Sequence, residues 1–291
     1  MSSKKIENGR YWNAAWQLID GCTPCSPGCD HCWSAGMTHR IGAKVTRHVF
    51  ESHIPSPFTN PDRKFNGKIK LHWDRLSIPL KRRKPTVFSC WNDLFHEAVP
   101  VNFLEESLAV MTNCPQHTFL VLTKRAQRLN LMTSDRLRVS RTDTWPIKNL
   151  WLGITVCNQQ EMEAKGKDFF SVPGNKFLSL EPLLSKVIIP PWVIEKHLLS
   201  AVICGGETGP GARPMHPDWV RSVRDQCAAA GVPFFLKSLG EWLFCDDMID
   251  RGMSWREDKH EFFEGFRRVG KQTAGRLLVG RTHNDLPWRV I

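Results

Sequence analysis

Short apolar runs recur along the chain and are separated by segments long enough to form helices. The predicted strands are 14–19, 69–73, 86–89, 118–123, 150–156, 176–180, 201–204 and 233–236. The predicted helices include 32–41, 102–113, 158–165 and 217–230. The last of these helices carries the clearest apolar stripe, and Gly231 marks its end because glycine readily adopts the left-handed conformation found there. The pattern predicts an α/β protein in which strands and helices alternate.

The predicted strands are apolar throughout, which is typical of a parallel sheet covered by helices. Seven or eight strand–helix units predict a full or partial parallel β/α barrel of the TIM type. A doubly wound open sheet is the alternative fold. Because the chain contains no tandem repeat and no low-complexity linker, we expect residues 1–291 to form a single barrel domain.

Polar or small residues follow the apolar stretch of most predicted strands. The carboxyl ends of barrel strands converge on one face, where active sites lie. We therefore expect these residues to line one site: Asp93, Lys124, Arg125, Thr155, Glu181, Gly205, Gly206, Glu207 and Lys237. Strand-end turns are commonly polar, and this simpler explanation accounts for some of the set.

The net charge of +11 changes the expected partner. Basic residues cluster at 81–84, at 124–128 and in a basic C-terminal segment at about 245–291. Such clusters favour a polyanion, and we expect nucleic acid, DNA in particular, or a nucleotide. Twelve tryptophans could supply faces on which bases stack. The polar N-terminus resembles no secretion signal and no apolar run is long enough to span a bilayer, so we expect a cytoplasmic protein without membrane contact.

Four cysteines lie within eleven residues, in the run GCTPCSPGCDHCW, and form a loop at 22–32. Counted from Cys25, the spacing is C-x3-C-x2-C, and counted from Cys22 it is C-x6-C-x2-C. Three thiolates so placed can bind three irons of a [4Fe–4S] cluster and leave the fourth iron open to another ligand. We expect three of the four cysteines, including Cys29 and Cys32, to bind the cluster.

Other uses of the cysteine loop are a structural zinc site, a four-cysteine electron-transfer cluster and disulfides. Structural zinc sites usually take two ligand pairs that are well separated in sequence, whereas here three residues separate the pairs. An electron-transfer cluster usually draws its fourth ligand from more distant sequence. Disulfides are rare in cytosolic proteins. An iron–sulfur cluster with one open iron is therefore the favoured interpretation.

The run CGGETGPGARP at 204–214 is the second strongest motif. Its glycines allow a ligand to approach the backbone closely, and its N–H groups could bind a carboxylate or anion. Glu207 would then receive an ammonium group, and Arg213 would contact phosphate. A glycine-rich turn that only closes a barrel strand is the alternative. Glu181 would bind a ribose hydroxyl or transfer a proton, unless it forms a salt bridge to Lys237.

Several stretches together resemble an uncharacterised phage and bacterial family of radical-SAM-like three-cysteine proteins. The resemblance covers residues from about 12 to about 282 and rests on GCTPCSPGCDHCW, SCWNDLFHEAVP, FLVLTKRAQRL, NLWLGITVCNQ, FLSLEPLL, the stretch from VICGGETGPGARP to FFLKSLGEW, and VGKQTAGRLLVGR. The family spacing matches Cys22, Cys29 and Cys32. Cys25 is additional and restores the C-x3-C-x2-C of the wider radical SAM superfamily. The GGE motif of that superfamily comes early in the chain, whereas here it comes late.

The resemblance implies a radical SAM-type barrel that binds a [4Fe–4S] cluster and S-adenosylmethionine (SAM). The open iron would chelate the amine and carboxylate of SAM, and a reductant protein would supply the electron that cleaves it. We expect catalytic roles for Glu181, Glu207 and Lys237, and cofactor contacts from Thr155, Glu181, Gly205, Gly206 and Glu207. Substrate or phosphate contacts are expected from Asp93, Lys124, Arg125 and Arg213. DNA repair or phage-type base modification would fit, and the sequence predicts no oligomeric state.

Two hypotheses of other classes make different predictions. A non-catalytic nucleic-acid-binding protein with a structural iron–sulfur or zinc centre would bind DNA in a salt-dependent way and would not cleave SAM. A metal-independent nuclease or glycosylase that used Asp93, Glu181 or Glu207 would stay active without the cysteines.

Overall fold

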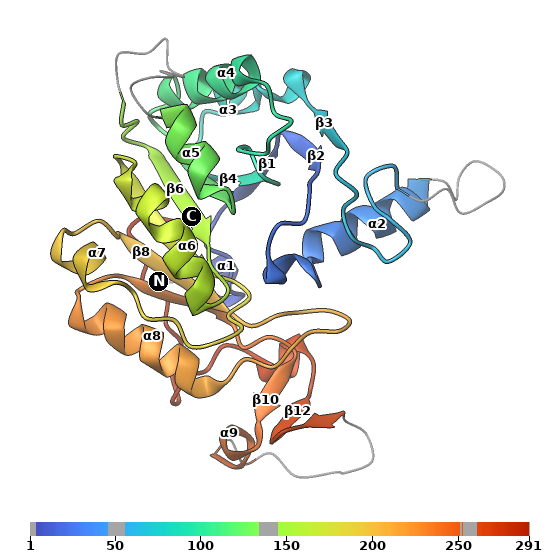
Figure 1. Ribbon diagram of the computed structural model, residues 1–291, viewed down its shortest axis with the longest axis vertical. Coiled ribbons are helices and arrows are strands. Elements are labelled where there is room, and N and C mark those ends of the chain that lie inside the picture. The colour runs from blue at the N-terminus through green and yellow to red at the C-terminus, as the bar shows by residue number, and fades with distance from the viewer. Residues whose placement is uncertain (1–3, 46–55, 134–144, 251, 253–260, 291) are drawn as a thin grey trace.

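The structure is a computed structural model that describes residues 4–45, 56–133, 145–250, 252 and 261–290. Its centre is a curled sheet of seven parallel strands, ordered β1-β4-β5-β6-β7-β8-β9 (Figure 1). These strands are β1 (Ala14–Gln17), β4 (Val87–Trp91), β5 (Thr118–Thr123), β6 (Leu150–Thr155), β7 (Asn175–Leu180), β8 (Ala201–Gly205) and β9 (Phe234–Ser238).

The sheet is a partial barrel. Each strand pairs in parallel with the next, and within the described residues no pairing joins β9 to β1. The strand order never reverses, as it would in a doubly wound sheet. The prediction of a parallel β/α arrangement is thus confirmed in its partial form.

Helices of the green to orange part of the chain cover the outer face of the sheet, whereas α2 projects away from it (Figure 1). The helices are α1 (Lys4–Glu7), α2 (Trp33–Val45), α3 (Ile78–Lys81), α4 (Val101–Thr112), α5 (Ala126–Thr133), α6 (Gln159–Ser171), α7 (Pro191–Glu195), α8 (Pro217–Ala229), α9 (Cys245–Asp250) and α10 (Lys271–Ala274). The apolar stripe of α8 is buried, and Gly231 has a φ of 63°. In the described part of the chain, no helix is long and apolar enough to cross a membrane.

One predicted barrel strand is wrong. The run at 69–73 forms β3 (Ile69–Leu71), which pairs antiparallel with β2 (Ile19–Gly21) outside the barrel. The predicted strand 14–19 is interrupted at Leu18, and the chain turns there from β1 into β2. The side chains of β3 stay partly exposed, so this strand lacks the two buried faces of a barrel strand.

The C-terminal segment adds a second small sheet. It has the order β10-β12-β11, formed by β10 (Trp242–Phe244), β12 (Phe266–Arg268) and β11 (Phe262–Phe263). This small sheet follows β9 in the chain, and its strands β10 and β12 lie at the bottom of Figure 1. The sequence predicted only a basic segment here, because these strands are too short to give a pattern.

Alternate side chains of each strand point into the barrel. Near the amino ends of the strands these side chains are apolar and form one cluster, which Tyr11, Trp288 and Val290 close from below. The strand residues of that cluster are Val87, Leu120, Phe177, Ala201, Ile203 and Phe235. Near the carboxyl ends most of the inward-facing side chains are small or polar, with Trp91 and Leu122 as exceptions. The barrel is therefore filled at one end and open at the other.

The N-terminal segment lies against both β9 and β4. Arg276 donates hydrogen bonds to the carbonyls of Ile6 and Glu7, the latter at 3.0 Å. Gly9, with a φ of 74°, lies so close to the Lys237 carbonyl that a Cβ would be 2.2 Å from its oxygen. Asn13 Oδ1 accepts from the N–H of Val87 at 2.8 Å. These bonds hold residues 6–13 between β9 and the start of β4, where Gly9, Arg10, Tyr11 and Trp12 contribute to the cavity described below.

Gly153 provides a test of barrel packing. It is the parallel partner of Phe177, and a Cβ at this position would lie 2.2–2.6 Å from the Phe177 ring. We expect Gly153→Ala to lower the free energy of unfolding by about 1–3 kcal/mol because the ring must move. Gly166→Ala in α6 is the matched control, since its Cβ would meet only Met162, at 3.8 Å. This control substitution should raise the free energy of unfolding by up to about 1 kcal/mol. Urea denaturation measures both, and equal effects would contradict the packing argument.

Candidate functional site

A cavity of about 690 Å³ lies at the carboxyl ends of the parallel strands. It brings together most of the residues that the sequence placed at strand ends. The predicted residues that line it are Cys22, Cys25, Cys29, Cys32, Asp93, Lys124, Arg125, Thr155, Glu181, Gly206, Glu207 and Lys237. Gly205 and Arg213 are not part of the lining, but Arg213 contacts Glu207.

The cysteine loop packs directly on the ends of β6 and β7. Ser26 caps a short 3-10 turn, η1 (Pro27–Cys29), by accepting from the N–H of Gly28. A Cβ at Gly28 would lie 2.4 Å from Cys157 Sγ and 3.0 Å from Pro182 Cδ. Only glycine fits this contact without a shift. The glycine thus lets the loop lie directly on the sheet edge, beside a fifth cysteine, Cys157, which is fully buried.

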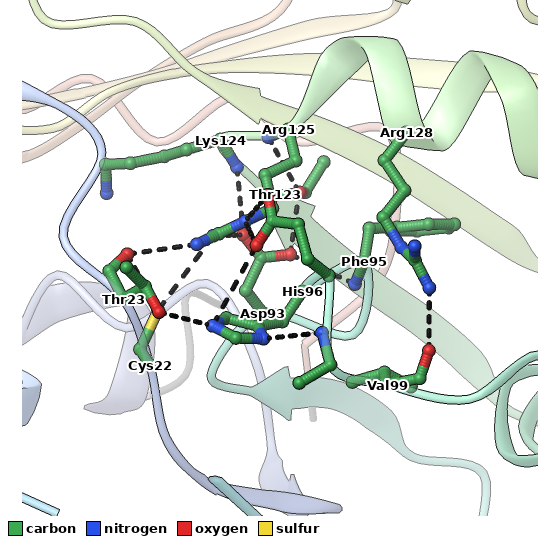
Figure 2. A network of polar contacts seen from close by, with 12 residues as sticks. Cys22, Thr23, Asp93, Phe95, His96, Val99, Thr123, Lys124, Arg125 and Arg128 are labelled. Carbon is green, nitrogen blue, oxygen red and sulfur yellow. Dashed lines mark hydrogen bonds and ion pairs between the residues drawn. The ribbon is translucent and has the colours of Figure 1, made fainter. Parts of the chain in front are cut away.

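Arg125 binds one side of the loop (Figure 2). Its guanidinium donates to Asp93 Oδ2 at 2.6 Å and to Glu97 at 2.7 Å. The remaining donors reach the Thr23 carbonyl at 3.0 Å and Cys22 Sγ at 4.0 Å. Arg125 therefore joins the first part of the loop to the end of β4, and its expected contact with phosphate stays a prediction.

The Arg125 network is completed by two neutral groups. The Thr123 hydroxyl donates to Asp93 Oδ1 at 2.7 Å. The ring of His96 lies 2.8 Å from Thr23 Oγ1, and its Nδ1 accepts from the N–H of Ala98, so Nε2 is the donor to Thr23. Burial lowers the pKa of His96, which keeps the ring neutral. Thr123 thus orients the carboxylate that binds Arg125, and His96 holds Thr23 of the loop directly.

Arg213 binds the other side of the loop. It donates to both oxygens of Glu207, at 2.6 and 2.8 Å, and to the Pro27 carbonyl at 2.8 Å. A further ion pair joins it to Asp30 at 3.5 Å. Gly211 packs on the ring of His31, where a Cβ would be 2.7 Å away. The glycine-rich run and the cysteine loop are therefore in direct contact, and the expected role of Glu207 toward an ammonium group stays a prediction.

The glycines of the GGE turn also serve backbone packing. A Cβ at Gly206 would lie 2.3 Å from the Leu239 carbonyl oxygen. The N–H of Glu241 donates to the Glu207 carbonyl at 3.2 Å. Gly205, in contrast, has only ordinary contacts around its Cβ position. The turn closes the carboxyl end of β8, which agrees with the simpler interpretation. The N–H groups of Gly206 and Gly209 donate to the Ser238 carbonyl at 3.0 Å and to Glu241 Oε1 at 2.9 Å, so these two groups are not available to a ligand.

The thiols of the loop differ in their surroundings. A hydrogen bond from Cys25 lowers the pKa of Cys29 to about 5 and raises that of Cys25. Burial raises the pKa of Cys22 to about 11, and Asp93 adds to this effect. Cys29 is thus the thiolate of the loop at neutral pH, whereas Cys22 is held as a thiol in the Arg125 network.

Lys124 lies between the cysteine loop and the sheet. Burial alone would lower its pKa, but the neighbouring sulfurs of Cys29, Cys157, Cys32 and Cys25 raise it. Figure 2 shows its side chain pointing away from the Arg125 network. The sulfurs of Cys25, Cys29, Cys32 and Cys157 are therefore all close enough to Lys124 to act on its charge. Within the described residues, no group of three or more His, Cys, Asp or Glu side chains already has metal-binding geometry.

The floor of the cavity holds polar atoms without protein partners. Lys237 donates to Glu181 Oε2, as the sequence allowed, while Oε1 of the same carboxylate is buried and accepts no hydrogen bond. Ser179 Oγ is likewise unpaired, and its residue is only 1% exposed. Buried polar groups are normally paired, so these atoms indicate a site for a ligand that donates hydrogen bonds. Ser179 ends the same apolar run as Glu181, where the sequence predicted polar strand-end residues, and it shares the inner face with Phe177 and Glu181 by alternation.

Removal of the Arg125 guanidinium should destabilise the protein. Arg125→Met leaves the buried Asp93 carboxylate without a cation, which we expect to lower the free energy of unfolding by about 3–5 kcal/mol. Arg224→Met is the matched control because Arg224 forms an exposed pair with Asp225 at 2.7 Å. The free energy of unfolding of this control variant should fall by less than about 1 kcal/mol. Urea unfolding compares the two variants, and a small effect at Arg125 would refute its role as an anchor.

The thiol pKa values predict distinct alkylation profiles in the metal-free protein. Cys29 is already a thiolate well below neutral pH, so its reaction rate with iodoacetamide should be nearly constant across the neutral range. The rate at Cys22 should rise steadily with pH because its pKa is about 11. Mass spectrometry of the labelled peptides measures both rates. Parallel pH profiles would show that the Cys25–Cys29 hydrogen bond does not form.

Comparisons with known proteins complete the description of the site. A search of curated proteins and a search of solved structures gave no match. One family model, described as "Protein of unknown function (DUF5131)", matches residues 5–287 and so includes the cysteine loop, the cavity and both arginine anchors. The chain therefore belongs to the DUF5131 family.

Proposed function

We propose that the protein is a radical SAM-type iron–sulfur enzyme that reductively cleaves SAM and acts on a nucleic acid or nucleotide. The observation that carries this proposal is the shared cavity of about 690 Å³. One wall of it holds four cysteines on a single anchored loop, and its floor holds unpaired acceptors of hydrogen bonds. A thiolate set beside a polar pocket suits a cluster that binds a second, polar cofactor.

Cys25, Cys29 and Cys32 fit the cluster better than a set that includes Cys22. Cys25 and Cys29 share a hydrogen bond, and both act on Lys124 together with Cys32. Cys22 instead contacts Arg125 and the Thr23 carbonyl. The proposed ligands thus have the C-x3-C-x2-C spacing, and Cys22 belongs to the anchor of the loop.

When bound, the cluster and SAM supply a hydrogen-abstracting radical, with the electron taken from a reductant protein. The residues of the chain would bind and orient the ligand. Glu181 Oε1 and Ser179 Oγ would accept hydrogen bonds from hydroxyl or ammonium groups of the ligand. Thr155 lines the same region, and Lys237 balances the charge of Glu181. The apolar cluster near the amino ends of the strands closes that end of the barrel and excludes water from it.

The charge of the cavity supports an anionic substrate. Among the described residues, seven lysines and arginines line it against three carboxylates. Each of these carboxylates is paired with a lysine or arginine: Asp93 with Arg125, Glu181 with Lys237 and Glu207 with Arg213. The excess positive charge is available to phosphate groups. DNA repair or DNA base modification is the proposed reaction class.

Cysteine variants test the proposal. After anaerobic reconstitution, the wild type should contain about four irons per chain. Its electron paramagnetic resonance signal should change on addition of SAM, and with a reductant it should form 5′-deoxyadenosine. Cys25→Ser, Cys29→Ser and Cys32→Ser should lose the cluster and the product, whereas Cys22→Ser should retain iron. Cys245→Ser, outside the cavity lining, is the matched control.

Two results would contradict the proposal. Stoichiometric zinc, or a cluster signal indifferent to SAM, would favour a non-catalytic nucleic-acid-binding protein with a structural metal centre. Loss of iron in Cys22→Ser but not in Cys25→Ser would assign the C-x6-C-x2-C set instead.

A further inference from the structure

Two tryptophans form an aromatic pair at the mouth of the cavity. Trp33 directly follows the last cysteine of the loop, and Trp91 is the last residue of β4. Their ring centroids are 5.7 Å apart at an angle of 31°, and both residues line the cavity. Ser34 donates to Asn92 Oδ1 at 3.0 Å, which joins the start of α2 to the end of β4 and keeps the pair in place.

Trp33 is the more accessible member of the pair, with 52% of its surface exposed. A large aromatic side chain that is half exposed yet held by a neighbour presents a flat apolar surface at a fixed position. Its place between solvent and cavity makes it accessible to a macromolecule as well as to a small ligand. Trp73 is similarly exposed, at 47%, but packs against Phe103 and does not line the cavity.

A second aromatic group with a basic partner lines the same cavity. The Arg10 guanidinium lies over the Trp12 ring at 4.5 Å from its centroid. Lys4 and Lys271 also contribute to the lining. The carboxylates of the cavity are already paired, so these cations add net positive charge to the tryptophan-lined opening. Aromatic faces interleaved with lysine and arginine are typical of surfaces that bind single-stranded nucleic acid.

We propose that Trp33, backed by Trp91, stacks on an unpaired nucleobase whose neighbouring phosphates bind Lys4, Arg10 and Lys271. This inference deepens the proposed function and rests on it for the chemistry that follows binding. An enzyme that acts on a base must take the base out of the duplex stack. The aromatic pair at the mouth provides a surface that replaces the lost stacking, and the cysteine loop ends at the residue before Trp33. The substrate class is single-stranded or locally unpaired nucleic acid.

Binding of a fluorescein-labelled thymidine oligonucleotide to the anaerobically reconstituted protein tests the inference. An abasic strand of equal length and charge is the matched probe, because it keeps the phosphates and removes the bases. We expect the wild type to bind the thymidine strand more tightly, by between about fivefold and 150-fold, if one base stacks. Trp33→Ala should abolish this preference, Trp33→Phe should retain part of it, and the control Trp73→Ala should keep it.

Equal affinity of the wild type for both strands would overturn the inference, as would an unchanged preference in Trp33→Ala. A loss of SAM affinity in Trp33→Ala, with the oligonucleotide preference intact, would assign the tryptophan to the cofactor and would also overturn it. Formation of 5′-deoxyadenosine is measured separately. Base-dependent binding without SAM cleavage would therefore refute the proposed function alone, and SAM cleavage without base-dependent binding would refute this inference alone.

Discussion

Two buried carboxylates at the sheet edge hold the cysteine loop in place. Asp93 and Glu207 are almost inaccessible to solvent, and a buried carboxylate without a cation is strongly destabilising. Arg125 and Arg213 neutralise them, and the remaining donors of these guanidiniums reach the carbonyls of Thr23 and Pro27 on the loop. The planar, multi-donor guanidinium can make both connections at once, which a lysine cannot do. The same two arginines therefore neutralise the buried carboxylates and fix the position of the cysteine loop.

This anchoring divides the cavity into regions of different chemistry. The loop holds its thiols on one wall, with Lys124 beneath them, while Glu181 and Ser179 leave acceptors unpaired at the floor. The two arginines are directed at protein groups, so the basic residues with room for a ligand lie elsewhere around the opening. In such a cavity the proposed metal cluster and a hydrogen-bonding ligand would occupy different positions. It also leaves an aromatic mouth through which a larger substrate can reach both.

The residues at the strand ends show which parts of the site could be predicted from the sequence. Convergence of Asp93, Thr155 and Lys237 on one cavity follows from the parallel strand order, which the apolar pattern had indicated. The error at 69–73 arose because an apolar run of that length suits an antiparallel ribbon as well as a barrel strand. Ser179 and Glu181 end the same apolar run and both line the cavity, because residues two apart on a strand share a face. The contact between Gly28 and Cys157 could not, because nothing in either segment signals it.

The sequence by itself determined the alternation of strands and helices, the single cluster of thiols and the positive charge, because these depend on local composition and spacing. The tertiary structure alone decided which arginine binds protein and which cation faces the cavity. It also separated Cys22 from Cys25, although both satisfy a plausible spacing. The physical reason is that ion pairing and burial depend on atoms brought together from distant segments, such as Arg213 and Pro27. These distances cannot be predicted from the order of residues, because they exist only in the folded barrel.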